Sequence, residues 1–255
     1  MKEIKLKVLS NKAIASNVYE MEFAVPENII LKSGQFINLS TGNRQHLLRR
    51  PFAIAAFTKD SFSICYQIKG SGTESLKHIQ KGSQLSALLP LGNYFLVKEN
   101  FYKIAVVGGG VGIFPLLALL KEYKKTKEIH SYIGFRSASY VCKVDDFQQD
   151  SKKAIFVTDD GSFAKKGNVV DAFISDIEKE KFDVVYACGP IAMLVALKEK
   201  FKQNNYNIPC FISLEERMGC GIGACLVCVC KNEAQNKNFR VCKDGPIFEL
   251  HEVNL

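Results

Sequence analysis

The carboxyl-terminal part of the chain holds cysteines with a spacing that suits an inorganic cofactor. Cys220, Cys225, Cys228 and Cys242 form the pattern C-x4-C-x2-C-x13-C. The first three have the spacing of plant-type [2Fe–2S] sites, in which a distant fourth cysteine completes the ligand set. Two irons bridged by two sulfides need four thiolates from a closely wrapped loop, and glycines at 219, 221 and 223 permit such a loop. The sequence therefore predicts a [2Fe–2S] centre in the tail.

Other interpretations of these cysteines stay open. Four cysteines could hold a structural zinc ion, although zinc sites usually pair two C-x2–4-C units and Cys242 has no such neighbour. They could also be buried free thiols. Cys230 could replace Cys228 or Cys242 as a ligand, because Cys228 and Cys230 would share one face of a strand. Only the C-x4-C-x2-C spacing favours Cys228.

Two glycine-containing turns predict a nicotinamide dinucleotide site. Gly110–Pro115 reads G-x-G-x-x-P between an apolar run and a helix, and Cys188–Pro190 follows a second apolar run. Backbone N–H groups at such junctions bind phosphates, and open α/β sheets bind ligands at the carboxyl ends of their strands. Plain tight turns, with Cys188 as a small buried hydrophobe, are the alternative. The choice between NAD and NADP stays open, because Arg136 could meet a 2′-phosphate. The predicted contacts are Gly110, Gly112, Cys188, Gly189 and Pro190.

Two arginines and a second glycine-rich turn predict a flavin site. Arg49 and Arg50 precede an expected strand, and Gly70–Thr73 opens an expected helix. An arginine beside a Gly-Thr helix start could clamp a pyrophosphate. Surface arginines without a ligand are the alternative.

Segments of two kinds must position these groups. Residues 1–99 contain short alternating strands separated by turns, which predicts an antiparallel β-barrel. From residue 100, buried strands alternate with helices, which predicts a parallel α/β sheet. We therefore expect a multi-domain β plus α/β fold with a barrel over 1–99, an α/β domain over 100–213 and a cluster domain over 214–255. The expected strands cover 2–9, 18–23, 36–39, 61–68, 104–107, 129–134, 154–158, 184–187 and 208–213, and the expected helices cover 71–80, 116–124, 169–179 and 191–201.

Composition excludes several classes of protein. The 255 residues are 47% hydrophobic and 24% charged, which is ordinary for a soluble domain. No apolar run approaches the roughly 20 residues that cross a bilayer, and the start of the chain does not resemble a signal peptide. The net charge of +8 comes from scattered lysines, so we expect no nucleic-acid partner, although an acidic protein partner is reasonable. Nine cysteines in such a chain favour metal or redox chemistry in the cytoplasm.

The order of these motifs resembles a known superfamily. The chain resembles ferredoxin–NADP reductases in the order of its motifs, which is R-P-x-x, G-x-G-T, G-x-G-x-x-P, C-G-P and a plant-type cysteine loop. The tail segments Glu216–Cys225 (ERMGCGIGAC) and Val241–Phe248 (VCKDGPIF) are similar to the electron-transfer subunits of type B, NAD-dependent dihydroorotate dehydrogenase. The resemblance covers essentially the whole chain. It implies an FAD-binding barrel, a nicotinamide-binding α/β domain and a [2Fe–2S] tail.

The resemblance also implies residue roles. Arg50 and Pro51 match a flavin-binding R-P-x-S, in which Ala53 replaces the serine and removes a hydroxyl contact. The expected ligands of the cluster are Cys220, Cys225, Cys228 and Cys242. No residue is expected to act as a general base or nucleophile, and His46, His78, His130 and His251 are scattered. The residues expected to hold FAD are Arg50, Pro51, Phe52, Ala53, Cys65, Tyr66, Gln67, Gly72 and Thr73.

The function implied by the resemblance is an electron relay. An FMN-containing partner subunit, in an assembly with two copies of each chain, would oxidise dihydroorotate to orotate for pyrimidine biosynthesis. Electrons would pass through the [2Fe–2S] cluster to FAD and then to NAD+. A related sulfide dehydrogenase, hydrogenase or ferredoxin–NADP reductase subunit is the alternative enzyme. A redox sensor or a zinc-stabilised interaction module that keeps only the fold is the non-enzyme alternative.

Overall fold

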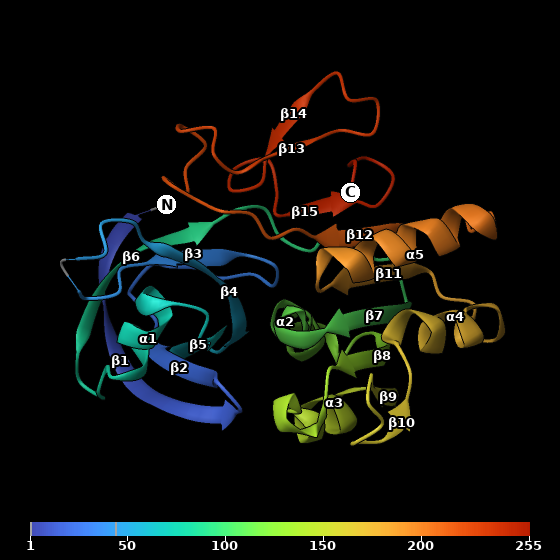
Figure 1. The fold of residues 1–255 in the computed structure, drawn as a ribbon, viewed down its shortest axis with the longest axis horizontal. Helices are drawn as coiled ribbons and strands as arrows, with labels where there is room; N and C mark the ends of the chain where they lie inside the picture. Colours follow the sequence, from blue (N-terminus) through green and yellow to red (C-terminus); the bar gives the residue numbers. More distant parts are fainter. Residues whose placement is uncertain (1, 44) are drawn as a thin grey trace.

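The chain folds into a barrel, an α/β sheet and a tail that lies across both (Figure 1). The structure is a computed structural model, and it describes residues 2–43 and 45–255. Three hydrophobic cores are present, one inside the barrel and one on each face of the sheet. The predicted fold class is confirmed. None of the helices in the described ranges is long and apolar enough to cross a membrane.

The barrel closes from six antiparallel strands in the order β1-β2-β5-β4-β3-β6. Alternating residues of each strand point inward, as the period of a strand requires. Ile37 and Leu39 of the third strand are fully buried in the barrel interior, whereas Phe36 packs with the core under the tail. The elements are β1 (Lys2–Ala15), β2 (Val18–Ala24), β3 (Phe36–Leu39), β4 (Arg50–Phe57), β5 (Ser61–Gln67), α1 (Ser71–Lys77) and β6 (Gln84–Leu91).

The second sheet has seven strands in the order β10-β9-β8-β7-β11-β12-β15. All neighbours are parallel except β12 and β15. The chain runs outward from β7 through β8 to β9 and then returns to β11 on the other side of β7. The carboxyl ends of β7 and β11 therefore form the switch point at which open α/β sheets bind ligands. The strands are β7 (Lys103–Gly109), β8 (Glu128–Phe135), β9 (Lys153–Thr158), β10 (Lys165–Lys166), β11 (Val184–Cys188), β12 (Cys210–Ser213) and β15 (Ile247–Glu249).

Helices cover both faces of this sheet. Apolar residues of α2 (Ile113–Tyr123) and α3 (Val144–Asp150) pack on one face, and those of α4 (Val169–Glu180) and α5 (Ile191–Gln203) pack on the other. Short 3-10 turns occupy Gly110–Gly112 and Ala138–Tyr140.

Charged residues close the amino end of the sheet. Lys103 Nζ lies 2.6 Å from a Glu180 carboxylate oxygen, and Lys153 Nζ lies 3.1 Å from the other. The hydrogen bond from Lys103, followed by that from Lys153, lowers the pKa of Glu180 to about 2. His130 is buried beside this carboxylate and contacts Glu128 at 3.0 Å. This network ties three strands to the end of α4, far from the switch point.

The tail is attached to both other parts. Its hairpin consists of β13 (Val229–Lys231) and β14 (Asn238–Arg240), and β15 extends the α/β sheet. Asn93, just after the barrel, donates to the carbonyl oxygens of Asp244 and Ile247 and accepts from the Ile247 amide at 2.9 Å. The predicted limits 1–99, 100–213 and 214–255 stay predictions, and the third of these segments contributes a strand to the sheet of the second.

The structure differs from the expected elements at several places. The first strand continues to Ala15, and the first helix of the α/β domain begins at Ile113. The sequence analysis contained no prediction for α3 or for the tail strands. Leu89–Leu91, which none of the expected strands includes, belongs to β6. Pro90 is tolerated there because the pairing of β3 with β6 shifts between Phe36 and Asn38, and prolines in sheets occur at such irregularities.

Candidate functional site

A cavity of about 280 Å³ lies between the barrel, α2 and the start of the tail. Its barrel wall comes from β4 and β5, the two strands that carry the predicted flavin residues 50–53 and 65–67. The predicted residues that line this cavity are Arg50, Pro51, Phe52, Ala53, Cys65, Tyr66, Gln67, Thr73 and Cys188. The structure thus brings together residues that lie far apart in the sequence.

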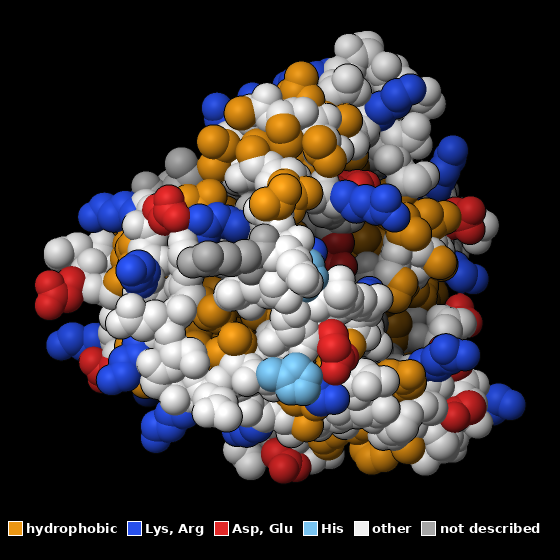
Figure 2. All heavy atoms as spheres, turned by 60° about the vertical axis from the view of Figure 1, so that its left-hand side comes forward, with side chains coloured by type: hydrophobic (Ala, Val, Ile, Leu, Met, Phe, Trp, Pro, Cys, Tyr) orange, Lys and Arg blue, Asp and Glu red, His pale blue; other side chains and the backbone are white. Residues whose placement is uncertain are grey.

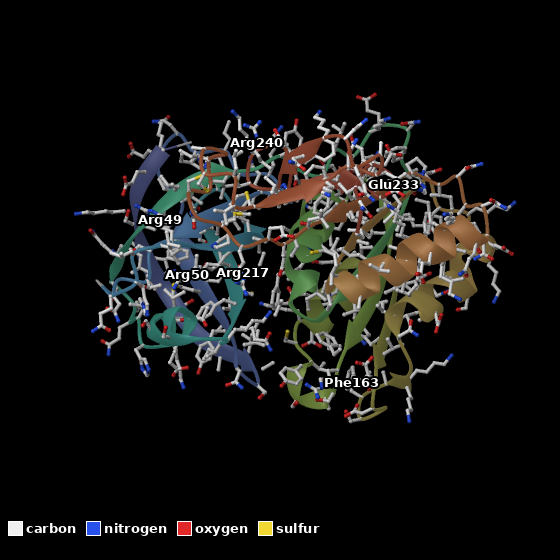
Figure 3. The ribbon with its side chains drawn as sticks, turned by 45° about the horizontal axis from the view of Figure 1, so that its top comes forward. Arg49, Arg50, Phe163, Arg217, Glu233 and Arg240 are labelled. Carbon is white, nitrogen blue, oxygen red and sulfur yellow. The ribbon has the colours of Figure 1, made fainter. Side chains whose placement is uncertain are left out.

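A second hollow, of about 710 Å³, adjoins this cavity. Residues 45–51 of the barrel and 215–218 of the tail line it, and Arg50, Pro51 and Met218 belong to both hollows. Figure 3 shows Arg49 and Arg50 on the barrel side and Arg217 on the tail side of this space. Arg49 and Arg50 make the barrel side of the second hollow basic, which suits the phosphates of a ligand, while Glu215 and Glu216 line the tail side.

Gly72 and Thr73 shape the phosphate end of the groove. A Cβ on Gly72 would lie 2.7 Å from the Arg50 guanidinium, so the arginine rests directly on the first turn of α1. Thr73 Oγ1 accepts from the amides of Lys69 at 2.9 Å and Gly70 at 3.3 Å, which fixes the turn before the helix. Gly72 therefore acts by giving space, and it does not line the cavity.

The predicted nicotinamide residues meet at the switch point. Cys188 pairs with Gly108 across β11 and β7, and a Cβ on Gly112 would lie 2.5 Å from the backbone of Cys188 and Gly189. The two glycine-containing turns therefore touch backbone to backbone. Burial raises the pKa of the Cys188 thiol well above its ordinary value, so the group stays a neutral thiol.

These turns contribute differently to the cavities. Of the five predicted nicotinamide contacts, only Cys188 lines the cavity next to β4 and β5. Gly110 lines a smaller adjoining cavity of about 160 Å³ together with Gln67, Arg136 and Phe114. Pro190 stands at the start of α5, and a Cβ on Gly189 would collide with Met193 at 2.7 Å. Gly112, Gly189 and Pro190 shape the switch point without lining either cavity.

The four predicted cluster cysteines form two adjacent pairs. The amides of Cys220 and Cys225 each lie 3.4 Å from the other residue's sulfur, and the Cys242 amide lies 3.4 Å from the Cys228 sulfur. The Gly223 amide donates to the Cys242 sulfur at 3.1 Å and so links the two pairs. A tetrahedral iron that shares two bridging sulfides needs two more ligands, so pairs of thiolates suit a two-iron centre.

Backbone donors surround the Cys220 sulfur. Burial raises the pKa of this thiol, but hydrogen bonds from the amides of Ile222, Cys225 and Ala224 outweigh that effect and lower the pKa to about 6. Burial, with the adjacent Cys228, raises the pKa of Cys242 to about 12. The loop thus directs several N–H groups at its sulfur atoms, as a site for a negatively charged iron–sulfur centre requires.

Cys230 lies apart from the two cysteine pairs. Among residues 2–43 and 45–255, no three His, Cys, Asp or Glu side chains converge as they would round one ion. Cys230 pairs with Phe239 in the hairpin and packs beside the core, and burial raises its pKa to about 11. No sulfur contact links it to the two pairs in the described residues. The two pairs suit a [2Fe–2S] cluster, and the choice of Cys220, Cys225, Cys228 and Cys242 as its ligands stays a prediction.

Hydrophobic side chains are exposed around the cysteine loop. Leu226 is 62% exposed and Val227 is 55% exposed, and Ile222 and Val229 are exposed nearby. Figure 2 shows hydrophobic atoms gathered at the top of that view, where Figure 1 places the tail, with lysines and arginines around them. A contiguous apolar surface with a polar rim is typical of a protein interaction site.

Comparison with known proteins agrees with this geometry. Residues 215–254 match the family described as "Iron-sulfur cluster binding domain of dihydroorotate dehydrogenase B", and residues 106–199 match "Oxidoreductase NAD-binding domain". A Caldanaerobacter subterraneus protein, 39% identical with 98% of each chain covered, is named "Dihydroorotate dehydrogenase B (NAD(+)), electron transfer subunit". A Bacillus velezensis protein with the same name is 37% identical over the whole of both chains.

The chain belongs to the dihydroorotate dehydrogenase B electron transfer subunit family. A solved structure described as an NADH-dependent reduced ferredoxin-NADP oxidoreductase has a TM-score of 0.87 at 27% identity, and covers 98% of this chain and 90% of its own. The family predicted from the tail motif is confirmed. The expectation of an oxidoreductase subunit with FAD, a [2Fe–2S] cluster and NAD as cofactors is confirmed with it.

Sequence reasoning missed several cavity residues of this family member. Ser213 ends β12 and Leu214 follows it, so the rule for carboxyl ends of parallel strands could have found them. Phe36 and Pro246 also line the cavity, but they come from the barrel and from the end of the tail. Nothing in the local sequence of these two residues indicates that they share a wall.

Proposed function

We propose that this chain exchanges electrons between NAD(H) and an FMN-containing partner subunit that oxidises dihydroorotate. The observation that carries the proposal is the shared wall between the cavity and the tail. Met218, two residues before Cys220, and Pro246, four residues after Cys242, both line the cavity. A flavin held by β4 and β5 would therefore be next to the segment that holds the cluster.

The barrel residues are proposed to hold FAD, which when bound can take electrons singly and pass a hydride to NAD+. Arg50 would bind the pyrophosphate through its guanidinium, which can donate two parallel hydrogen bonds to phosphate oxygens. Pro51, Phe52 and Ala53, with Cys65, Tyr66 and Gln67, form the strand wall against which a flat ring could lie. Tyr66 already donates its hydroxyl hydrogen to Asn11, so it contributes to the wall rather than to proton transfer.

The switch point is proposed to hold the nicotinamide end of NAD. Val111, Phe114 and Cys188 line the cavity beside the proposed flavin wall, and the contact of Gly112 with the Cys188 backbone keeps this corner narrow. The adjoining cavity at Gly110 and Arg136 would take the phosphates and ribose. A neutral, buried Cys188 thiol offers shape and excludes water, and it needs no ionisation for that role.

The tail is proposed to hold the cluster and to meet the partner. Cys220 with Cys225 and Cys228 with Cys242 would each bind one iron, and the exposed apolar surface round Leu226 would dock on the partner. We expect two copies of each subunit in a cytoplasmic assembly. No group that lines the cavity is assigned as a general base, because removal of hydrogen from dihydroorotate would take place on the partner.

The proposal is tested by reconstitution. The chain is co-expressed with the candidate FMN subunit, purified without oxygen, and assayed for NADH formation on addition of dihydroorotate. Formation of NADH that requires both chains is expected. Bound FAD and an intact cluster without turnover would instead favour a related reductase with another partner, since the structural neighbour at a TM-score of 0.87 is described as a ferredoxin-NADP oxidoreductase.

A further inference from the structure

Asn38 is a buried polar residue for which the chain itself supplies no partner. Its side chain is fully buried in β3, and neither its amide nitrogen nor its amide oxygen has a hydrogen-bond partner among the described residues. Buried polar groups are nearly always paired, and one that is left unpaired destabilises the fold. The amide nitrogen and oxygen of Asn38 are therefore expected to bind a group that does not belong to the described residues.

The strand geometry shows which way this amide points. In β3, Ile37 and Leu39 fill the barrel interior, so Phe36 and Asn38 face outward. Phe36 packs in the core that contains Cys228 and Cys242, and it also lines the proposed flavin cavity. The outward face of β3 is thus the layer between that cavity and the cysteine loop.

Asn38 lies against the loop at its first cysteine. A Cβ on Gly221, the residue after Cys220, would lie 2.6 Å from the Asn38 amide nitrogen. On the neighbouring strand Asn38 is opposite Pro51, which lines both hollows of the groove. The amide therefore stands between the proposed flavin wall and the Cys220 side of the proposed cluster.

We propose that the Asn38 amide donates an N–H···S hydrogen bond to the sulfur atoms of the cluster on its Cys220 side, and so raises the cluster's reduction potential. Sulfides and thiolates bound to iron can only accept hydrogen bonds, and an amide N–H donor is what this side chain offers. Such bonds stabilise the reduced centre, which carries one more negative charge. The adjacent loop already directs the amides of Ile222 and Ala224 at the Cys220 sulfur, so a further donor from Asn38 would add to an existing set. Asn38 would thus act on the cluster directly, and the inference rests on the proposed ligation by the four cysteines.

The test uses the full chain with FAD and cluster bound, purified without oxygen. Iron content is measured first, and the cluster is then titrated against potential by its EPR signal. Asn38→Leu keeps the side-chain size and removes the donor, so the ratio of reduced to oxidised cluster at a fixed potential should fall three- to tenfold. Tenfold corresponds to 59 mV for one electron. The matched control is Ser63→Ala, which removes another buried, unpartnered polar group from the same barrel and should leave the potential unchanged.

Each outcome decides the inference. An Asn38→Leu protein with wild-type iron content and wild-type cluster potential would overturn it, as would a shift in the flavin potential alone. If the variant does not take up iron, the wild-type chain labelled with ¹⁵N in asparagine side chains answers the question. A nitrogen coupling to the reduced cluster would then support the bond, and its absence would refute it. A wild-type chain without iron would overturn the cluster assignment itself.

Discussion

Gly112→Ala is the sharpest test of the switch point. The new Cβ would lie 2.5 Å from three backbone atoms of Cys188 and Gly189, about 1 Å closer than ordinary van der Waals contact. The φ of Gly112 is −66°, so alanine can adopt this backbone conformation without strain. The loss of stability should therefore come entirely from the contact of the new Cβ with the backbone of Cys188 and Gly189. Backbone atoms of β11 cannot rotate away as a side chain can. Overpacking of this kind typically costs about 1–3 kcal/mol.

That cost has two measurable consequences. For a chain of this size each kcal/mol lowers Tm by about 2–4 °C, so the variant should melt roughly 2–12 °C below the wild type. Reduction of the bound flavin by NADH, followed by loss of flavin absorbance in stopped flow, should need higher NADH concentrations. Gly70→Ala is the control for the melting temperature alone, because its extended backbone and open surroundings accept a Cβ freely, whereas its place in the proposed flavin turn excludes it from the flavin assay. A Gly112→Ala protein with wild-type Tm and wild-type flavin reduction would refute the assignment of this contact.

Three further predictions address the remaining parts of the molecule. Cys225→Ser should lose its iron and its dihydroorotate-linked NADH formation, while NADH still reduces its flavin. Cys230→Ser should keep its iron. Iron analysis, the NADH-formation assay and the flavin-reduction assay check this. Gly72→Ala should lower flavin affinity by displacing the Arg50 guanidinium, with no loss in Tm because alanine favours a helix; flavin retention on dilution checks it. Glu180→Gln should have a lower Tm than the wild type at pH 7. The difference in Tm should disappear as pH falls from about 4.5 to 2, because the pKa of the Glu180 carboxyl is lowered in the folded state. Thermal melting of both proteins over this pH range checks the prediction.

Residues whose chemistry restricts their spacing were predictable from the sequence. The C-x4-C-x2-C loop has its spacing because one short segment must bring several thiolates together, and the structure places Cys220 beside Cys225 as that requires. The turns at Gly112 and Cys188 were predictable for a similar reason, since both follow buried parallel strands whose carboxyl ends lie at one edge. In these cases the function sets the local pattern.

Residues that act through long-range packing were not predictable. In the sequence Asn38 is one polar residue in a short apolar strand. Its proposed role depends on its contact with a loop about 180 residues later in the chain. The addition of β15 to the sheet was missed because three residues with no alternating pattern do not identify a strand. The close approach of Gly92 to Pro246 also depends on long-range packing, because it joins the end of the barrel to the tail.

These long-range contacts also bear on how electrons would move through the chain. A tail on a flexible linker could carry its cluster to the partner and back, but this tail is bound to both the barrel and the α/β sheet through residues 244–249. Asn93 binds the backbone of Asp244 and Ile247, and β15 is hydrogen-bonded to β12 of the α/β sheet. Movement of the cysteine loop away from the barrel would break these bonds and expose Phe36 and Phe248, which are buried. A fixed distance between cluster and flavin is therefore favoured, and docking of the partner at the exposed apolar surface round Leu226 would complete the path without a domain movement.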